Sequence, residues 1–373
     1  MGVCEMKEIA TLTTHGADNY GAILQAHALH SYIEGMGYEC RILNYIPEYT
    51  VEEYRLIRTP KNLRWVIYAA YQVIHYNKRK KRKDRFAAFR DQYKALSGDV
   101  IKKVDDLVQI ANEYDTVVIG SDQIWNPRIH DADEAYFLSF PDVATRKISY
   151  AASFGQDSID ETFKPEMARR LRGFSEFACR EHSGIQIINE LTGKEASFVL
   201  DPIFLIDVEE WTKLALAPND TAHYDMLYFL SDPGKSPYAL KKYSERRGNT
   251  TLSIGFSPYD CRYRVTCNYT LGPREFLGAI KNADCIITNS FHCTAFAILF
   301  EKRFFVRLQS GKDARNDRML SLLTELGLED RTYFDKNAEK LDFDKEIDYK
   351  AAKEKLNALI RQSKGYLSRA LGV

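Results

Sequence analysis

The sequence has no long hydrophobic run and no net charge of either sign. Lys plus Arg and Asp plus Glu each number 52 among 373 residues, so no overall field favours nucleic acid as a partner. No apolar stretch approaches the ~18 residues of a membrane-spanning helix, and Met1 is not followed by the apolar core of a signal peptide. The absence of these features predicts a soluble protein of the cytoplasm.

Cysteine is present but forms no recognisable pattern. The seven cysteines are scattered and odd in number, and no group of Cys and His has the spacing of zinc ligands. Several lie in apolar stretches, where a free cysteine packs as a small hydrophobic residue. We therefore expect no metal site, and a reducing compartment fits this usage best.

Strand and helix patterns alternate in two successive series. The expected strands of the first series are residues 8–14, 39–45, 116–120, 147–152, 177–180 and 197–200. Those of the second series, which starts after about Leu205, are residues 226–230, 251–255, 285–288 and 303–308. This alternation predicts an α/β protein with two Rossmann-like doubly wound domains that face a cleft. The first polar loop is not GxGxxG, so a dinucleotide fingerprint is absent.

The two series divide the chain into segments. We place an N-terminal domain at residues 1–205 and a C-terminal domain at residues 206–345. The last segment, residues 346–373, contains an expected amphipathic helix over Tyr349–Leu371 that packs back on the first domain. Residues 46–100 interrupt the first series, because basic and aromatic side chains replace the alternating pattern there.

This interruption contains six consecutive basic residues, from Lys78 to Lys83. A run of like charges is usually the solvated face of a helix. The alternative is a patch that holds the protein on an anionic membrane, where each basic side chain contributes about 1 kcal/mol. Trp65 and Tyr68 lie nearby and are residue types common at membrane interfaces. Both interpretations stay open.

One strand–turn–helix stretch carries the strongest candidate for chemistry. The β-branched run at 285–288 is typical of a strand buried on both faces, and Asn289 and Ser290 are helix N-cap residue types. His292 therefore lies at a strand-to-helix turn, beside backbone N–H groups that favour an anion. In an open α/β sheet this position faces the ligand crevice. A half-buried histidine that caps its own turn is the alternative.

Several motifs at expected strand ends support a family resemblance. They are Asn-Tyr-Gly at 19–21, Gly-Ser-Asp-Gln-Ile-Trp-Asn-Pro at 120–127, Ser-Tyr-Ala-Ala-Ser-Phe-Gly at 149–155, Arg-Glu-His-Ser-Gly at 180–184, Asp-Pro at 201–202, Ser-Phe-His at 290–292 and Arg-Asn-Asp-Arg at 315–318. The two doubly wound units look like the architecture of GT-B glycosyltransferases. The motifs resemble the polysaccharide pyruvyl transferase family over nearly the whole chain.

The resemblance implies a reaction and its substrates. Members of this family transfer pyruvate from phosphoenolpyruvate to a sugar as a ketal and release phosphate. Phosphoenolpyruvate is then a co-substrate, no cofactor is needed, and the acceptor is a sugar of a polysaccharide or lipid-linked glycan, reached at the inner face of the cell membrane. This chemistry requires anion-binding groups and a general acid for carbon 3. His292 matches the family's histidine and is the expected acid.

The resemblance also implies two sets of binding residues. The family commonly has Arg two residues before the histidine, whereas this chain has Ser290, so one bidentate anion contact is missing. We expect Asn289 and Ser290 in the donor site, with a replacement cation from among Arg262, Arg264, Arg315 and Arg318. The expected acceptor residues are Asn19, Tyr20, Ser121, Asp122, Gln123, Trp125 and Arg180. For Asp122 a turn-capping role, and for Trp125 packing under a loop, are the alternatives.

Two other functions stay open at this stage. A GT-B glycosyltransferase would bind a nucleotide sugar and usually presents an acidic residue to the ribose, whereas the corresponding strand ends here offer Asn289 and Arg315. A non-catalytic glycan-binding relative would bind oligosaccharide without responding to phosphoenolpyruvate.

Overall fold

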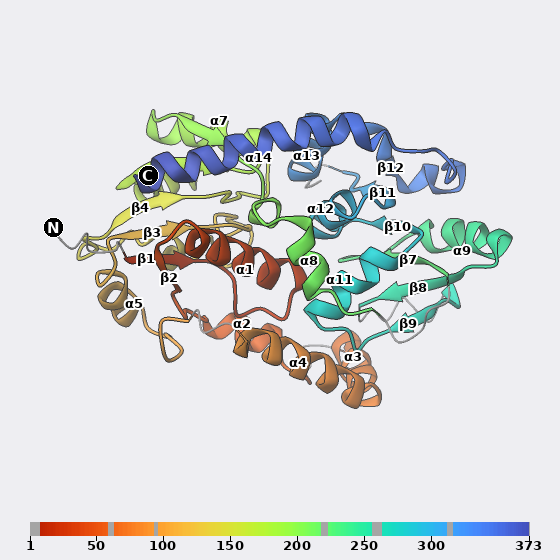
Figure 1. The fold of residues 1–373 in the computed structure, drawn as a ribbon. Coiled ribbons are helices and arrows are strands. Elements are labelled where there is room, and N and C mark those ends of the chain that lie inside the picture. The colour runs from red at the N-terminus through yellow and green to blue at the C-terminus, as the bar shows by residue number, and fades with distance from the viewer. Residues whose placement is uncertain are drawn as a thin grey trace.

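The computed structural model describes residues 8–58, 63–92, 96–217, 223–255, 263–311 and 316–372. Within these ranges the strands form two six-stranded sheets (Figure 1). The first contains β1 (Glu8–Leu12), β2 (Glu39–Ile42), β3 (Thr116–Ile119), β4 (Arg146–Ser149), β5 (Phe174–Cys179) and β6 (Ala196–Phe198). The second contains β7 (Tyr224–Tyr228), β8 (Thr250–Ile254), β9 (Thr266–Asn268), β10 (Cys285–Thr288), β11 (Arg303–Leu308) and β12 (Thr332–Phe334). Neighbouring strands in both sheets are parallel, which confirms the predicted fold class.

Helices connect the strands in both domains. Those of the first are α1 (Tyr20–Gly35), α5 (Val104–Ala111), α6 (Lys164–Leu171) and α7 (His182–Thr192). Those of the second are α8 (Val208–Leu214), α9 (Ser236–Arg247), α11 (Pro273–Asn282), α12 (Phe291–Leu299) and α13 (Asp317–Leu326). The insertion forms α2 (Glu48–Glu53), α3 (Leu63–Ile74) and α4 (Tyr76–Asp91), and the last helix is α14 (Tyr349–Leu371). Short 3₁₀ helices are Glu134–Phe137, Pro202–Phe204, Glu329–Arg331 and Asp335–Lys340.

Each sheet reverses its strand order once. The first has the order β2-β1-β3-β4-β5-β6, with the reversal between β1 and β3. The second has the order β12-β11-β10-β7-β8-β9, with the reversal between β10 and β7. In open parallel sheets, ligands bind outside the carboxyl ends of the strands at such a reversal. The loops after β1, β3, β7 and β10 are therefore the places where a ligand is expected.

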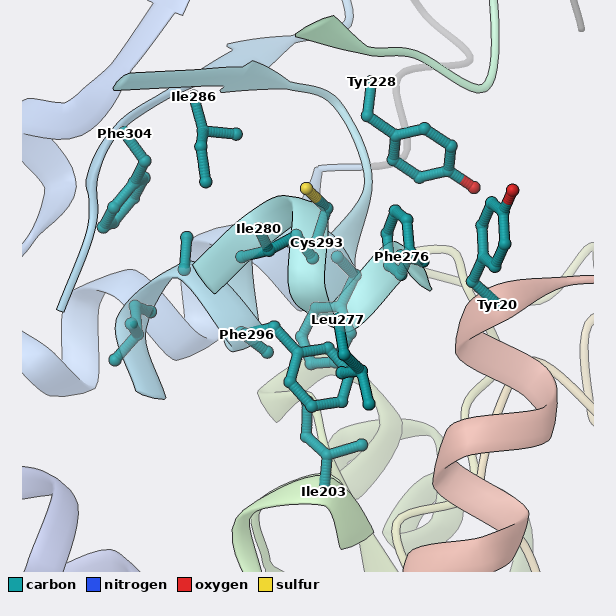
Figure 2. Packing of buried hydrophobic residues seen from close by; sticks show 14 of the residues in the cluster. Tyr20, Ile203, Tyr228, Phe276, Leu277, Ile280, Ile286, Cys293, Phe296 and Phe304 are labelled. Atoms are coloured by element: carbon teal, nitrogen blue, oxygen red, sulfur yellow. The ribbon is translucent and has the colours of Figure 1, made fainter. Parts of the chain in front are cut away.

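A continuous hydrophobic core joins the two domains (Figure 2). Tyr20, at the start of α1, stacks on Phe276 of α11 with ring centroids 4.1 Å apart. The hydroxyl of Tyr20 donates a hydrogen bond of 2.8 Å to the backbone oxygen of Leu271. Because Tyr20 belongs to the first domain and its partners to the second, this contact fixes the start of α1 against the second domain.

Two long helices reinforce this junction from opposite sides (Figure 1). On α14, Leu356 packs in the core of the second domain, while the Tyr366 hydroxyl donates to the backbone oxygen of Ser149 in the first at 2.8 Å. On α4, Arg85 donates to the backbone oxygen of Thr270 at 2.8 Å. The contacts of α14 confirm that the C-terminal helix packs back on the first domain. The domain limits at 205 and 345 stay a prediction.

The basic run lies on α4 and faces two ways. Lys78, Lys80 and Lys81 are exposed, as a solvated face requires, whereas Arg79, Arg82 and Lys83 are half-buried and face inward. Only half of the run is therefore available to a membrane surface. Among the described residues, no helix has the length and apolar character needed to cross a bilayer.

A substitution on α14 tests the junction. Leu367 is fully buried among first-domain residues, so Leu367→Ala should lower the free energy of unfolding by about 2–5 kcal/mol, as expected for a buried leucine truncated to alanine. Asn357→Ala, at an exposed position of the same helix, should change it by less than about 0.5 kcal/mol. Denaturant unfolding measures both values. Equal values for the two variants would contradict docking of α14.

Candidate active site

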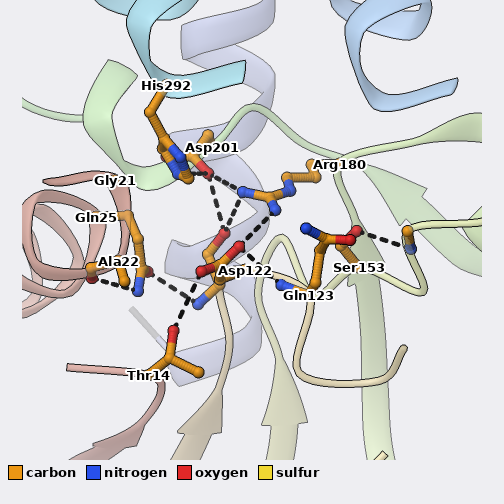
Figure 3. A network of polar contacts seen from close by, with 12 residues as sticks. Thr14, Gly21, Ala22, Gln25, Asp122, Gln123, Ser153, Arg180, Asp201 and His292 are labelled. Atoms are coloured by element: carbon orange, nitrogen blue, oxygen red, sulfur yellow. Dashed lines mark hydrogen bonds and ion pairs between the residues drawn. The ribbon is translucent and has the colours of Figure 1, made fainter. Parts of the chain in front are cut away.

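Four strand ends from both domains bring five polar side chains together in what we call the interdomain cluster (Figure 3). Ser121 and Asp122 follow β3, Arg180 follows β5, Asp201 follows β6, and His292 lies in the first turn of α12 after β10. The cluster therefore forms where the crevice residues of the two sheets meet.

Arg180 is the centre of the cluster. Its side chain is almost fully buried, at 2% exposure. Nη1 donates to Asp201 Oδ2 at 2.5 Å, and Nη2 donates to Asp122 Oδ1 at 3.0 Å. The guanidinium also lies 4.8 Å from the ring centroid of Phe291 on α12, a cation–π distance. One first-domain arginine thus contacts two carboxylates of its own domain and an aromatic ring of the other.

The imidazole of His292 lies at the boundary between the domains. Its Nε2 is 3.5 Å from Asp201 Oδ2, which is long for a hydrogen bond, so the attraction is mainly electrostatic. Its Nδ1 packs against Gly21 so closely that a Cβ at position 21 would lie only 2.0 Å away. Any larger residue at position 21 would displace this imidazole.

The charges of the cluster determine its protonation. Burial alone would raise the pKa of Asp201, but the neighbouring His292 and Arg180 hold that pKa well below its usual value. Asp122 is affected in the same way: burial opposes ionisation, yet Arg180 and His292 lower its pKa. Both carboxyls are therefore ionised at neutral pH, and Asp201 presents its negative charge to the imidazole of His292.

Glu181, next to this cluster, has a raised pKa instead of a lowered one. Burial raises its pKa, although Arg180 and Arg318 act in the opposite direction. Its Oε1 accepts a 2.8 Å hydrogen bond from the backbone N–H of Phe154. Glu181 is thus the carboxyl of this region that gains a proton most readily.

Hydrogen bonds hold the Ser121–Asp122 turn in place. The Ser121 hydroxyl lies 3.0 Å from the backbone oxygen of Ala151 and 3.1 Å from Asp201 Oδ2, so both acceptors compete for its proton. Asp122 adopts a positive φ of 77°, a conformation that non-glycine residues rarely adopt. The Thr14 hydroxyl donates to Asp122 Oδ2 at 3.2 Å. These bonds stabilise an unusual backbone that directs Asp122 toward the loop after β1.

A cavity of about 550 Å³ opens beside Asp122. Asn19, Asp122 and Gln123 form part of its wall, together with aromatic residues of the insertion. The hydroxyls of Tyr45 and Tyr49 both donate to Asp133 Oδ2, at 3.0 and 2.8 Å. Aromatic faces interspersed with polar groups are suited to binding a sugar.

A family model described as polysaccharide pyruvyl transferase matches residues 19–307. The chain belongs to the polysaccharide pyruvyl transferase family. The match spans every residue of the interdomain cluster, confirms the resemblance seen in the sequence, and makes the protein an enzyme.

Solved structures with the same architecture are distant in sequence. A glycosyltransferase from Rickettsia africae is 9% identical, with a TM-score of 0.53 and 99% of each chain covered. The UDP-GlcNAc 2-epimerase from Neisseria meningitidis, solved with UDP-GlcNAc, is 11% identical, with a TM-score of 0.53 and coverage of 98% of this chain and 99% of that chain. These matches show a shared GT-B-like fold. Among curated protein sequences, none matches significantly.

Of the acceptor residues expected for a pyruvyl transferase, some reach the cavity and others are buried. Asn19, Asp122 and Gln123 line it. Ser121 and Arg180 lie behind them in the interdomain cluster. Tyr20 and Trp125 are buried: Tyr20 packs between the domains, and the Trp125 indole donates to the backbone oxygen of Tyr136 at 3.3 Å. Trp125 thus packs under a loop, which is the alternative given above to a role in acceptor binding.

The expected donor residues divide similarly. Ser290 is the N-cap of α12 and accepts from the Cys293 backbone N–H at 3.4 Å, and Asn289 accepts from the Leu230 N–H at 2.8 Å. Arg318 lies at the start of α13 and acts electrostatically on the carboxyls beside Arg180. Arg264 is exposed beside the edge strand β9. Arg262 and Arg315 lie outside the described residues.

Sequence patterns alone did not assign a site role to several of these residues. The Asp-Pro motif contains Asp201, but an Asp-Pro pair is as much the signal of a stiff linker as of a site. Gly21 belongs to the Asn-Tyr-Gly motif, but its contact with His292 depends on how the two domains pack together. Tyr45, Tyr49 and Asp133 belong to none of the sequence motifs, and tyrosines are as frequent in cores as in cavities.

The contact between Gly21 and His292 can be tested by adding one methyl group. Gly21→Ala should lower the free energy of unfolding by about 1–3 kcal/mol, the usual cost of overpacking. Gly35→Ala is the matched control, because a Cβ there would meet nothing within 4 Å, and it should stay within about 1 kcal/mol of the wild type. Chemical denaturation measures both. Equal stability of the two variants would show that the imidazole does not lie against Gly21.

Proposed function

We propose that this pyruvyl transferase takes pyruvate from phosphoenolpyruvate and attaches it to two hydroxyls of a sugar in a polysaccharide or lipid-linked glycan precursor. Phosphoenolpyruvate carries a phosphate and a carboxylate, which guanidinium groups and helix N-termini bind well. Arg180, Arg318 and the first turn of α12 lie together at the carboxyl ends of both sheets. This convergence of cations supports binding of the donor there.

His292 is proposed as the general acid. As the first sugar hydroxyl attacks carbon 2, carbon 3 takes a proton from the imidazolium and becomes a methyl group. The second hydroxyl then attacks carbon 2, and the bond from carbon 2 to the phosphate oxygen breaks. The neutral imidazole regains one hydroxyl proton, and the departing phosphate carries the other. Atoms and charge balance without any further reactant.

The observation that carries this proposal is the meeting of His292 with Asp201. A buried carboxylate lies 3.5 Å from Nε2 and orients the imidazole, the group that has to deliver the proton. The same carboxylate binds Arg180. His292, Asp201 and Arg180 are buried against one another, so a donor molecule must separate them in order to bind. Its phosphate and carboxylate would then replace Asp201 as the partner of Arg180 and His292.

The cavity beside Asp122 is the proposed acceptor site. It adjoins the interdomain cluster through Asp122, whose Oδ1 is bound to Arg180 while its Oδ2 accepts from Thr14. A sugar in the cavity would present its hydroxyls toward the donor from the side of the first domain. If the acceptor is lipid-linked, the exposed Lys78, Lys80 and Lys81 are the side chains available for an anionic membrane at its cytoplasmic face.

Replacing His292 tests the acid directly. His292→Gln should remain folded and reduce phosphate release from phosphoenolpyruvate about 10²- to 10⁴-fold, the usual contribution of one positioned acid. A coupled assay of phosphate release with a sugar acceptor present measures this rate.

His223→Gln is the control, since its imidazole is highly exposed, with 82% of the side-chain area accessible. It should turn over at the wild-type rate. If His292→Gln also keeps near-normal turnover, another residue is the acid and His292 has only a structural role in its turn.

A further inference from the structure

A second cavity, of about 240 Å³, lies between the two domains. One wall comes from the insertion and contains Arg58, Arg79, Arg82 and Lys83. The other comes from the carboxyl ends of β7 and β8, at residues 228–230 and 255. Neither His292 nor Arg180 lines it, so the proposed donor site does not account for these cations.

The cavity wall has an excess of positive charge. Four basic side chains lie against only two acidic ones, Asp18 and Glu53. Asp18 is bound most closely by a residue outside the cavity wall, Arg90, at 2.8 Å. Arg82 donates instead to neutral oxygens, the backbone oxygen of Asp18 at 2.7 Å and the hydroxyl of Tyr20 at 3.3 Å. Lys83 donates to the backbone oxygen of Tyr54 at 3.0 Å and lies 3.9 Å from Asp18 Oδ2. Asp18 is thus shared between Arg90 and Lys83, and the basic side chains of the wall still outnumber the acidic ones.

The basic side chains of this wall repel one another, and this repulsion affects the pKa of Arg79. Burial lowers its pKa, and the nearby charges of Arg58 and Arg82 lower it further, although Tyr68 opposes them. A bound anion would relieve this repulsion. Charge-assisted hydrogen bonds between arginine and phosphate oxygens are the strongest that such a wall can make.

The two cavities adjoin each other. Asn19, Glu53 and Tyr54 line both the cavity proposed for the acceptor sugar and this basic cavity. A ligand with a sugar at one end and phosphates at the other could therefore occupy both across the shared wall.

We propose that the basic cavity binds a diphosphate group through which the acceptor sugar is linked to its carrier. The link to the acceptor rests on the proposed pyruvyl transfer, whereas diphosphate binding does not. The carrier can be a lipid or a nucleoside, since the same cations would bind the diphosphate of either.

Calorimetric titration with sodium pyrophosphate at low ionic strength tests the site without any reaction. The double variant Arg79→Gln, Lys83→Gln should weaken pyrophosphate binding by about 100-fold or more, because each charge-assisted hydrogen bond contributes at least about tenfold. The matched control Lys80→Gln, Lys81→Gln removes two charges from exposed positions of the same helix. It should change the affinity less than about threefold, because solvent-exposed charges are screened.

A second variant keeps the cations intact. Leu230 lines the opposite wall and is 61% exposed, so Leu230→Glu should fold normally while placing a negative charge in the cavity. It should also weaken pyrophosphate binding, whereas Val73→Glu, at an exposed position of α3 outside the cavity, should not. Equal losses in the cavity and control variants, or no loss in either, would overturn the proposed site.

Kinetics then identify the ligand. With the sugar supplied as a lipid diphosphate, as a nucleoside diphosphate and as a neutral methyl glycoside, the cavity variants should raise KM for the two diphosphates and not for the methyl glycoside, with kcat unchanged. The natural carrier is then the diphosphate with the lower KM in the wild-type enzyme. A rise for all three would contradict the link to the carrier. If no acceptor supports phosphate release while pyrophosphate still binds as expected, the proposed function fails and the diphosphate site stands.

Discussion

The buried ion pair between Arg180 and Asp201 is the interaction on which the rest of this site depends. Two charges removed from water are stable only when each has a good partner, and removing one partner typically costs about 3–5 kcal/mol. Here the pair is extended by Asp122 on one side and by His292 of the other domain. His292 meets Asp201 only when both domains are in place, so the pair couples the arrangement of the domains to the geometry of the site.

Close packing between the two domains positions these charged groups. The imidazole can approach Asp201 because Gly21 has no side chain, and α1 is held at the correct position by Tyr20, which is anchored in the core of the second domain. The helices α4 and α14 add contacts on both sides of the junction. A small change in the angle between the domains would thus separate His292 from Asp201, the separation that donor binding is proposed to require.

The sequence predicted most of the fold and one part of the site. The alternation of strands and helices is local, and Cys285–Thr288 and Tyr349–Leu371 have the bounds that the pattern predicted. The position of His292 followed from a strand, an N-cap and an apolar helix in succession. Family motifs then located Ser121, Asp122 and Arg180.

What the sequence left open depends on contacts between distant segments. Helical spacing shows that Arg79, Arg82 and Lys83 share a face of α4, but only the packed structure shows that this face lines a cavity against the second domain. Tyr20 and Trp125 are residue types equally suited to ligand and core, and tertiary packing places both in the core. The role of Asp201 depends on which charges surround it, which no local pattern encodes.

In the proposed reaction, this protein protonates carbon 3 of phosphoenolpyruvate and transfers the resulting group to a sugar. The most direct measurement is the reaction of phosphoenolpyruvate with candidate sugar acceptors in deuterium oxide, followed by phosphate release and by NMR of the product. The account predicts phosphate release only when an acceptor is present, and a ketal whose methyl group carries one deuterium. Consumption of a nucleotide sugar with phosphoenolpyruvate left intact, or phosphate release that needs no acceptor, would contradict it.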